Sequence, residues 1–512
     1  MVLPRRRDLR IAVLAVISLG LVVGAVKLTD DTNDPVPTGT EADGPTSEVS
    51  PSTSPSSTPT TNPAIAALTP AAAPGTGPLG LKWSWGQPAT FPFIADAAGG
   101  WAFAEVEWCD VQPSPDVFDW TAVDRVVSDS RALGFEPMLK LRTGQCWATD
   151  PPSHEGRDTT ENVTKETSTP PTDETAYLSF VQELVQRYAA RGVDDYAIEN
   201  EPDVPNFWAA PVADYGTMAR QVADAIHEVQ PEATVMDGGA SSTAYGVAMA
   251  AAQIDLDPQQ ALRTYRDYYA RRIAGGVSRF PDVTGVAQLR RVLASDPAVR
   301  AEETVALTID LANSGVVDAY QLHYYEAAAQ LPQVLGFLDA RLDDGVPVEA
   351  WEVGVAWPGA GHDERAQAAE TFRMVGLLLA DDVRRIVYLP VAYSEAPGKT
   401  QVFRGLIEPT GALLPPGSGW LRLTEALSGL HDAPLQPAGG NLAGVTWQVG
   451  NRQAALVWAR RGTVALDPDD VSEVVTPSGT VVPGVPTVGS EPVLVLGSAR
   501  GALTRKVGGG GY

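Results

Sequence analysis

The chain has 512 residues, of which 44% are hydrophobic, so it can form several domains or one large barrel with an extensive core. Its formal net charge of −26 argues against nucleic-acid binding and against docking on anionic lipid through a basic surface. Because it has only two cysteines, Cys109 and Cys146, it is neither a disulfide-framework protein nor a cysteine-based zinc protein.

The N-terminus carries an export pattern. Four arginines among residues 5–10 precede an apolar run over residues 11–26. This order predicts that residues 1–29 form either a cleaved signal peptide or an uncleaved signal anchor. Both forms engage the export machinery, and the anchor also engages the membrane. Either way, the rest of the chain is expected to be extracellular or on the cell surface.

Residues 30–77 are dominated by Pro, Ser, Thr, Ala and acidic side chains. Such a segment cannot bury enough apolar surface to fold, so the composition predicts a disordered linker. Its expected role is to hold the following domain away from the cell surface.

From residue 78, short β-type apolar runs alternate with helical patterns. The runs span 81–85, 102–108, 136–142, 195–200, 233–239, 317–325, 346–354 and 384–393. Eight strands that alternate with helices predict fold class α/β, with a (β/α)8 TIM barrel over residues 78–432. The alternative, an open doubly wound sheet, favours a glycine-rich phosphate loop after the first strand, and the sequence carries none there.

After about Pro434 the pattern changes to short alternating runs that are separated by glycine and proline turns. This pattern predicts a small all-β sandwich domain over residues 433–506. Residues 507–512 are expected to form a flexible tail.

Two acidic residues follow predicted barrel strands. Glu201 lies in the stretch Asp195–Asp203, and Glu352 ends the run 346–354. Parallel strands in a barrel end at one rim, so both carboxyl groups are expected to face each other across its mouth. One acid at a strand end is common by chance, but two at these strands are more specific. A carboxyl pair about 5–5.5 Å apart is what hydrolysis of a glycosidic bond with retention requires.

Three stretches resemble clan A retaining glycoside hydrolases. The similarity is strongest to family 39, which contains β-xylosidases and α-L-iduronidases, and to related bacterial exopolysaccharide hydrolases. WCDVQPSPDVFDW (108–120) is similar to the tract after strand two, IENEPD (198–203) to the acid/base Asn-Glu-Pro, and WEVGVAWP (351–358) to the nucleophile strand. The resemblance covers about residues 80–430.

The resemblance implies a role for each matching residue. Glu201 would be the acid/base and Glu352 the nucleophile. Asn200 would hold the 2-hydroxyl of the sugar in the −1 subsite. Tyr325 would donate a hydrogen bond to the nucleophile, with His323 beside it on the same strand face. No metal and no organic cofactor is implied.

The sequence departs from the family pattern at several positions. Glu199 stands where these families often carry Trp, and it is either a solvated strand-end acid or a group that perturbs the titration of Glu201. Strand two lacks the basic residue often found near its end, so Arg142 on strand three is the candidate replacement. Trp208 and Trp357 fall on predicted rim loops, where aromatic rings either stack on sugars or only pack the loop.

Cys109 and Cys146 lie just past neighbouring predicted strands of an exported chain. This placement predicts a disulfide, and two buried free thiols are the alternative.

The sequence therefore predicts an exported, monomeric retaining glycosidase that cleaves an oligosaccharide or polysaccharide. Two other functions stay open. One is a non-catalytic carbohydrate-binding or cell-wall protein on the same barrel, because a fold does not determine a function. The other is a transglycosylase that uses the same carboxylate pair. The motifs of metallopeptidases, serine esterases and P-loop proteins do not occur in the sequence.

Overall fold

The computed structural model describes residues 61–150, 157–158, 164–165, 167–359, 361–393, 402–430, 434–449, 452–466, 471–483 and 487–498. The predicted signal segment, most of the predicted linker and the predicted tail lie outside these residues. Among the helices of the described part, none is both long and apolar enough to cross a membrane.

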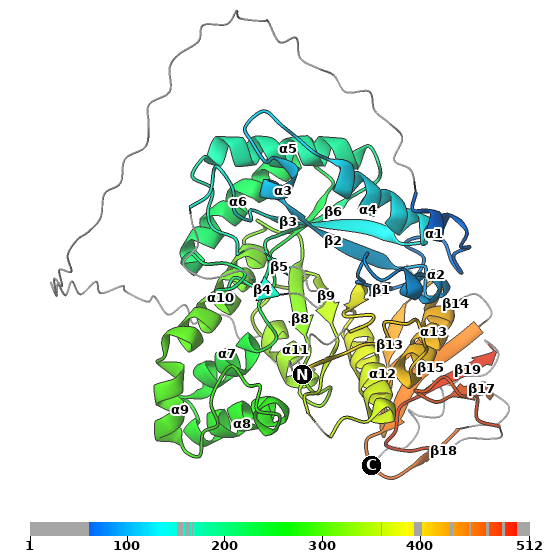
Figure 1. The fold of residues 1–512 in the computed structure, drawn as a ribbon. Coiled ribbons are helices and arrows are strands. Elements are labelled where there is room, and N and C mark those ends of the chain that lie inside the picture. Colours follow the sequence, from blue (N-terminus) through cyan, green and yellow to red (C-terminus); the bar gives the residue numbers. More distant parts are fainter. Residues whose placement is uncertain are drawn as a thin grey trace, which may run out of the picture. The chain divides into compact units, whose positions relative to one another are not determined.

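Two four-stranded parallel sheets form the centre of the described chain (Figure 1). The first has the order β1 (Leu79–Leu81), β11 (Ile386–Tyr388), β9 (Val348–Val353) and β8 (Tyr320–Tyr324). The second has the order β2 (Trp101–Glu107), β3 (Glu136–Arg142), β6 (Asp195–Ile198) and β7 (Thr234–Met236). Neighbouring strands in both sheets pair in parallel. Most residues of these strands are buried, as expected for parallel strands that are covered on both faces.

The two sheets meet at both of their edges. On one side, an isolated parallel bridge joins Met236 at the end of β7 to Ala319 just before β8. On the other side, a Cβ atom at Gly80 of β1 would lie only 2.2 Å from the backbone oxygen of Trp101 in β2. Glycine at position 80 is therefore what lets these two strands approach each other.

The interior between the strands is filled by an apolar layer and closed at one end by charges. The apolar layer consists of Trp101, Phe103, Met138, Ala197, Met236, Ala319, Trp351 and Val387. At the N-terminal ends of the strands, Arg385 forms ion pairs with Asp195 and Glu349. Side chains therefore fill the interior from the N-terminal ends of the strands upward. The polar site lies at the opposite, C-terminal ends.

Helices follow the strands along the chain. They are α2 (Phe91–Asp96), α3 (Trp108–Val111), α4 (Thr121–Ala132), α5 (Glu174–Ala189), α6 (Val212–Val229), α10 (Asp296–Asn313), α11 (Leu331–Asp339) and α12 (Glu364–Ala380). Three more, α7 (Ala244–Gln253), α8 (Pro258–Ala274) and α9 (Val286–Leu293), are inserted between β7 and α10. The shorter elements are η1 (Pro88–Thr90), β4 (Arg157–Asp158), β5 (Thr164–Lys165), β10 (Val355–Ala356) and β12 (Phe403–Arg404).

The predicted linker ends earlier than residue 77. Residues 61–77 contain the short helix α1 (Pro63–Ala66), and the Ile65 side chain is 1% exposed. The backbone N–H of Asn62 donates to Asp129 Oδ1 of α4 over 2.9 Å. Further along, the N–H groups of Ala71 and Gly77 donate to the carbonyls of Ala95 and Gly99. The prediction of disorder up to residue 77 is therefore wrong, because one buried apolar side chain and these hydrogen bonds fix the last part of the segment.

The C-terminal part contains a five-stranded antiparallel sheet. Its order is β13 (Leu435–Pro437), β14 (Leu442–Val449), β15 (Arg452–Ala459), β19 (Val493–Ser498) and β17 (Val471–Val475). Helix α12 packs against this sheet, with Gly376 beside the Trp458 ring. Helix α13 (Pro415–Leu427) also contacts it, because Trp447 of β14 donates from Nε1 to the Ala426 carbonyl over 3.1 Å. A second pair, β16 (Val464–Ala465) with β18 (Thr487–Val488), shares an apolar cluster with β14, β15, β17 and β19.

Candidate active site

Polar side chains gather where four central strands end. Lys140 lies on β3, Glu201 follows β6, His323 lies on β8 and Glu352 lies on β9. His323 and Glu352 are direct partners in the β8–β9 register. Because all four strands are parallel, their C-terminal ends bring these side chains to one rim of the sheets.

The backbone around Glu201 is strained. Among the described non-glycine residues, only Glu199 (φ +63°), Glu201 (φ +40°) and Asp382 have a positive φ, and the first two flank Asn200. Pro202 has no N–H to continue the strand, while the Glu201 N–H donates to the Gly238 carbonyl over 3.0 Å. Such conformations cost on the order of 1–3 kcal/mol each and persist where the surrounding structure holds them. Here they turn the Glu201 side chain into the site.

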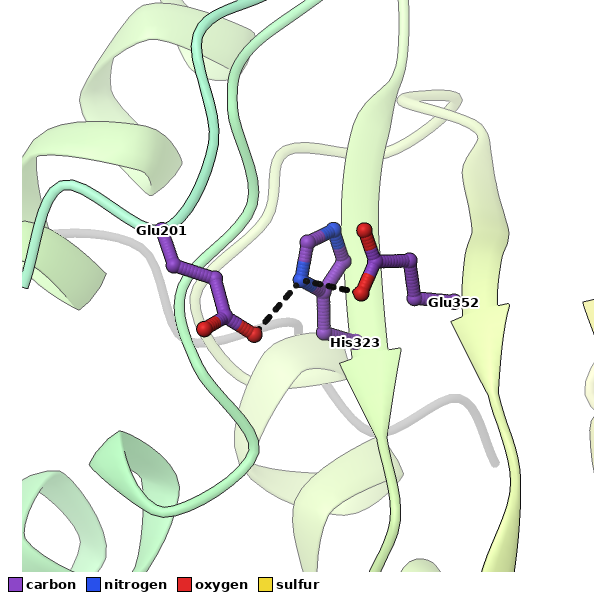
Figure 2. Close-up of side chains that lie close together, drawn as sticks. All are labelled: Glu201, His323 and Glu352. Carbon is purple, nitrogen blue, oxygen red and sulfur yellow. Dashed lines mark hydrogen bonds and ion pairs between the residues drawn. The ribbon is translucent and has the colours of Figure 1, made fainter. Parts of the chain in front are cut away.

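The carboxyl groups of Glu201 and Glu352 lie on either side of the His323 ring (Figure 2). His323 Nδ1 is 3.1 Å from Glu201 Oε1 and 3.6 Å from Glu352 Oε2. One carboxylate oxygen of each glutamate and one ring nitrogen of His323 all lie within 4.8 Å of one another. All three side chains are largely buried, so the two acids share a small space with little solvent.

Lys140 is a site residue that was not predicted from the sequence. Its side chain is fully buried, and its Nζ donates to Glu352 Oε1 over 2.8 Å and to Asn200 Oδ1 over 2.6 Å. The Tyr325 hydroxyl donates to the other oxygen of Glu352 over 2.9 Å. Both oxygens of Glu352 therefore accept a hydrogen bond, one of them from a charged donor. The hydrogen bond that the family resemblance implied for Tyr325 is present.

The electrostatic environment keeps Glu352 ionised. Burial alone raises the pKa of a carboxyl group, but His323 and Lys140 outweigh that effect and hold the pKa of Glu352 well below its usual range. Glu352 is therefore a carboxylate at neutral pH. A carboxylate that is buried, ionised and fixed by two donors is suited to act as a nucleophile.

Arg142 does not contact Glu352. Its fully buried guanidinium lies 2.6 Å from Glu107, 3.5 Å from Glu105 and 3.8 Å from Glu199. Side chains two residues apart on a strand share a face, so Lys140 projects to the same side and is the basic residue at the nucleophile. The expectation that Arg142 replaces the basic residue missing from strand two, as a substrate contact, stays a prediction.

Glu199 is not a solvated acid. Its side chain is fully buried, and its Oε1 accepts a hydrogen bond from the Thr143 N–H over 2.6 Å. Burial raises the pKa of Glu199, and the Arg142 guanidinium opposes this shift. The hydrogen bond from Thr143 to Glu199 therefore links the segment after β3 to the segment after β6, beneath the residues that face the site.

The two tryptophans proposed to contact substrate differ in position. Trp208 is fully buried, donates from Nε1 to the Pro211 carbonyl over 3.1 Å and packs edge-on against Tyr215. It therefore supports the loop after Glu201, and the expectation that it contacts a sugar is wrong. Trp357 is half-buried, and the Arg271 guanidinium lies 4.5 Å from its ring centre. Arg271 therefore already occupies one face of that ring.

A disulfide joins Cys109 in α3 to Cys146 in the loop after β3, with their Cα atoms 5.1 Å apart. It links the segments that follow the neighbouring strands β2 and β3. Trp147, next to Cys146, packs edge-on against Trp108 and is 38% exposed.

Gly239 provides the space that His323 occupies. Its φ is +68°, and a Cβ atom there would lie 2.5 Å from His323 Nε2. Gly315 offers a matched control, because its φ is +69° and no atom lies within 4 Å of its Cβ position.

We expect Gly315→Ala to lower the free energy of unfolding by about 1–2 kcal/mol, the cost of a positive φ in an alanine. Gly239→Ala should lose clearly more, because His323 must move as well. Denaturant unfolding of both variants measures the difference, and equal losses would mean that His323 is free to shift.

Glu201, His323 and Glu352 are also the described group that could hold a metal ion by spacing. The Lys140 ammonium, however, already lies 2.8 Å from a Glu352 oxygen and would repel a second cation there. The donor set therefore fits a site for proton transfer and nucleophilic attack better than a metal centre.

Comparisons with known proteins agree with this fold. A family 39 glycoside hydrolase from the gut symbiont Bacteroides cellulosilyticus WH2 superposes with a TM-score of 0.54 at 15% identity, covering 84% of this chain and 83% of that one. A GH39 β-xylosidase from Caulobacter crescentus gives a TM-score of 0.52 at 15% identity, covering 83% and 97%. No family model and no curated protein matches the chain. The resemblance to family 39 is thus confirmed at the level of the fold.

Proposed function

We propose that the protein is a retaining glycoside hydrolase, with Glu352 as nucleophile and Glu201 as acid/base. The observation that carries this proposal is the placement of two carboxylate oxygens, one from each residue, within 4.8 Å of each other. Retaining enzymes hold their two carboxyl groups about 5–5.5 Å apart, whereas inverting enzymes leave about 6.5–9.5 Å for a water molecule. The short separation favours direct attack by a carboxylate.

In the first step, the Glu352 carboxylate attacks the anomeric carbon while Glu201 gives its proton to the glycosidic oxygen. The bond between anomeric carbon and leaving oxygen breaks, and a covalent glycosyl–enzyme forms. In the second step, Glu201 takes a proton from a water molecule, which attacks the anomeric carbon and frees Glu352. Two displacements restore the original anomeric configuration.

The neighbours of the pair have matching tasks. Lys140 and Tyr325 hold Glu352 as a carboxylate before attack and stabilise it again as the leaving group of the second step. The Asn200 amide oxygen is taken by Lys140, so its nitrogen is the donor left for a sugar hydroxyl. This supports the proposed contact between Asn200 and the 2-hydroxyl in the −1 subsite.

The remaining predictions belong to the same proposal. The ring of neighbouring parallel strands supports a (β/α)8 barrel, and the two antiparallel sheets after residue 433 support a small β-sandwich. The basic and apolar N-terminal residues support export, with the enzyme extracellular or anchored at the cell surface. The substrate would be an oligosaccharide or polysaccharide, cleaved by a monomer without a metal or organic cofactor.

A screen against aryl glycosides and purified polysaccharides tests this function. Once a substrate is found, proton NMR of the first-formed sugar reports its anomeric configuration before mutarotation. The proposal expects the configuration of the substrate, and the opposite anomer would contradict it. Transfer of the sugar to an added alcohol or saccharide, instead of to water, would identify a transglycosylase.

Replacement of Lys140 by Met should impair the nucleophile through its charge. We expect kcat to fall by about 10²-fold to 10³-fold, the size observed when a donor to a developing charge is removed. Without the ammonium, the pKa of Glu352 rises, so the acidic limb of the pH–rate profile should move up by about 1–3 pH units.

Tyr325→Phe is the matched control for Lys140→Met. It removes the hydrogen bond to the other oxygen of Glu352 but no charge, so its acidic limb should move less. Equal shifts in the two variants would mean that the charge of Lys140 does not set the ionisation of Glu352.

A further inference from the structure

A buried chain of hydrogen bonds runs from Glu201 away from the reacting centre. His323 Nδ1 faces Glu201 Oε1, and His323 Nε2 lies 2.8 Å from Gln321 Oε1. Gln321 Nε2 in turn donates to the backbone carbonyl of Asp237 over 2.5 Å. Gln321, His323 and Asp237 are each fully buried, so water does not compete for these contacts.

The chain has one fixed direction. A backbone carbonyl can only accept, so the amide nitrogen of Gln321 must face Asp237 and its amide oxygen must face His323. That oxygen can only accept as well, which requires a hydrogen on His323 Nε2. The opposite tautomer would place a lone pair of His323 Nε2 against a lone pair of Gln321 Oε1. Both atoms are buried, so this unsatisfied contact would destabilise the folded protein.

The fixed tautomer decides how many protons lie between His323 and Glu201. With Nε2 protonated, a neutral His323 presents a lone pair at Nδ1, and an ionised Glu201 presents another at 3.1 Å. One further proton must therefore lie between them, on the carboxyl oxygen or on the ring nitrogen. This is the proton that the glycosidic oxygen needs in the first step proposed above.

Resting on the proposed function, we propose that Gln321 is a positioning residue that keeps the catalytic proton on the Glu201–His323 pair by fixing the His323 tautomer. Loss of this proton to water would leave two facing lone pairs unless His323 moved its Nε2 hydrogen to Nδ1. Gln321 disfavours that tautomer, because its amide oxygen needs the hydrogen on Nε2. In catalysis the proton passes from the pair to the leaving oxygen, and water returns it in the second step.

Other charges face the pair from the surrounding elements. They are Glu352 from β9, Lys140 from β3, Asp237 after β7 and Arg272 of α8. The Arg272 guanidinium interacts electrostatically with the Glu201 carboxyl group. Burial raises the pKa of Asp237 to about 6, against the hydrogen bonds from the N–H groups of Gly239 and Gln321. An Asp237→Asn background therefore shows which part of a titration belongs to Asp237.

The tautomer can be read in the protein alone by NMR of imidazole nitrogens in ¹⁵N-histidine-labelled protein. The chain has five histidines, and the loss of one set of signals in His323→Asn assigns His323. The expected result is an Nε2-bound hydrogen at every pH where the fold persists. A neutral His323 with its hydrogen on Nδ1 would overturn the proposal.

Gln321→Leu removes the acceptor and should release the tautomer. His323 should then populate both tautomers, and its ¹⁵N signals should move toward the average of the two neutral forms. Gln321→Met is a second variant in case leucine disturbs packing. Unchanged His323 signals in a folded variant would refute the role of Gln321.

The chain carries its own control for these signals. Gln367 Oε1 lies 2.8 Å from His362 Nε2, and Gln367 Nε2 donates to the Gly405 carbonyl over 2.8 Å. Gln367→Leu should alter the His362 signals and leave those of His323 in place. Because these readings need no turnover, an inactive protein with the expected tautomer would count against the proposed function alone.

Discussion

Glu352→Gly should abolish turnover, with kcat falling on the order of 10⁶-fold, the loss seen when a covalent nucleophile is removed. The glycine leaves room for a small anion beside Lys140, which normally pairs with the lost carboxylate. Added azide should therefore restore cleavage of an activated aryl glycoside and give a glycosyl azide with the opposite anomeric configuration. NMR of that product identifies the face from which Glu352 normally attacks.

Glu349→Gln is the matched control for this variant. Glu349 lies on the same strand, three residues earlier, and pairs with Arg385 at the other end of the interior. The Glu349→Gln variant should have a lower melting temperature than the unmodified protein and unchanged turnover. Full activity in a folded Glu352→Gly variant, or azide rescue with retained configuration, would contradict the role of Glu352 as nucleophile.

Glu201→Ala should give a loss that depends on the leaving group. For a poor leaving group we expect kcat/KM to fall by about 10²-fold to 10⁴-fold, the usual contribution of general acid catalysis. A dinitrophenyl leaving group needs no proton, so its departure should be little affected. The second step then lacks its base, and a burst of dinitrophenol followed by slow turnover should appear.

Glu199→Gln separates this effect from general damage near β6. Glu199 is also buried and also has a positive φ, but it pairs with Arg142 and Thr143 rather than with the site. It should reduce stability without changing the dependence on the leaving group. Equal rate losses of Glu201→Ala for all leaving groups would contradict proton donation by Glu201.

Most central strands could be predicted from the sequence because they are short β-type runs before a polar exit. The first was misplaced, since β1 is Leu79–Leu81 and shares only residue 81 with the predicted run 81–85. The run 136–142 coincides with β3, and 102–108 differs from β2 by one residue at each end. The run 384–393 was predicted too long, since β11 ends at Tyr388 and Pro390 cannot donate to a ladder. The helical insertion 257–312 proved to be three helices. The first break spans residues 275–285 and begins and ends with glycine, and the second lies at Ala294 and Ser295, before the proline that opens α10.

The catalytic pair could be predicted because its chemistry lies in local motifs at strand ends. Lys140 could not, because nothing in the sequence EPMLKLR says which of two basic side chains on one strand face reaches the nucleophile. That choice depends on depth within the interior, where Lys140 lies above the Phe103 ring and Arg142 lies among three acids. The single signal available was that a lysine in an apolar strand must find a partner when buried.

Gln321 and Trp208 also show what the sequence could not predict: a role was missed for Gln321 and wrongly expected for Trp208. Gln321 has no motif of its own, and its role follows from contacts with His323 and the Asp237 carbonyl that only the folded chain brings together. Trp208 has the appearance of a sugar-stacking residue on a rim loop, yet the loop folds inward and buries it. Loop residues are therefore the part of the site that sequence patterns predict least well.

Trapping the covalent intermediate would show directly whether Glu352 is the nucleophile. The protein is exposed to a panel of 2-deoxy-2-fluoro glycosides, which slow both displacements, and its intact mass is measured before and after. We expect one sugar adduct, mapped by peptide sequencing to Glu352 and absent from Glu352→Gln, if Glu352 has this role. An adduct on Glu201, or none in a protein that hydrolyses the corresponding unfluorinated glycoside, would contradict it.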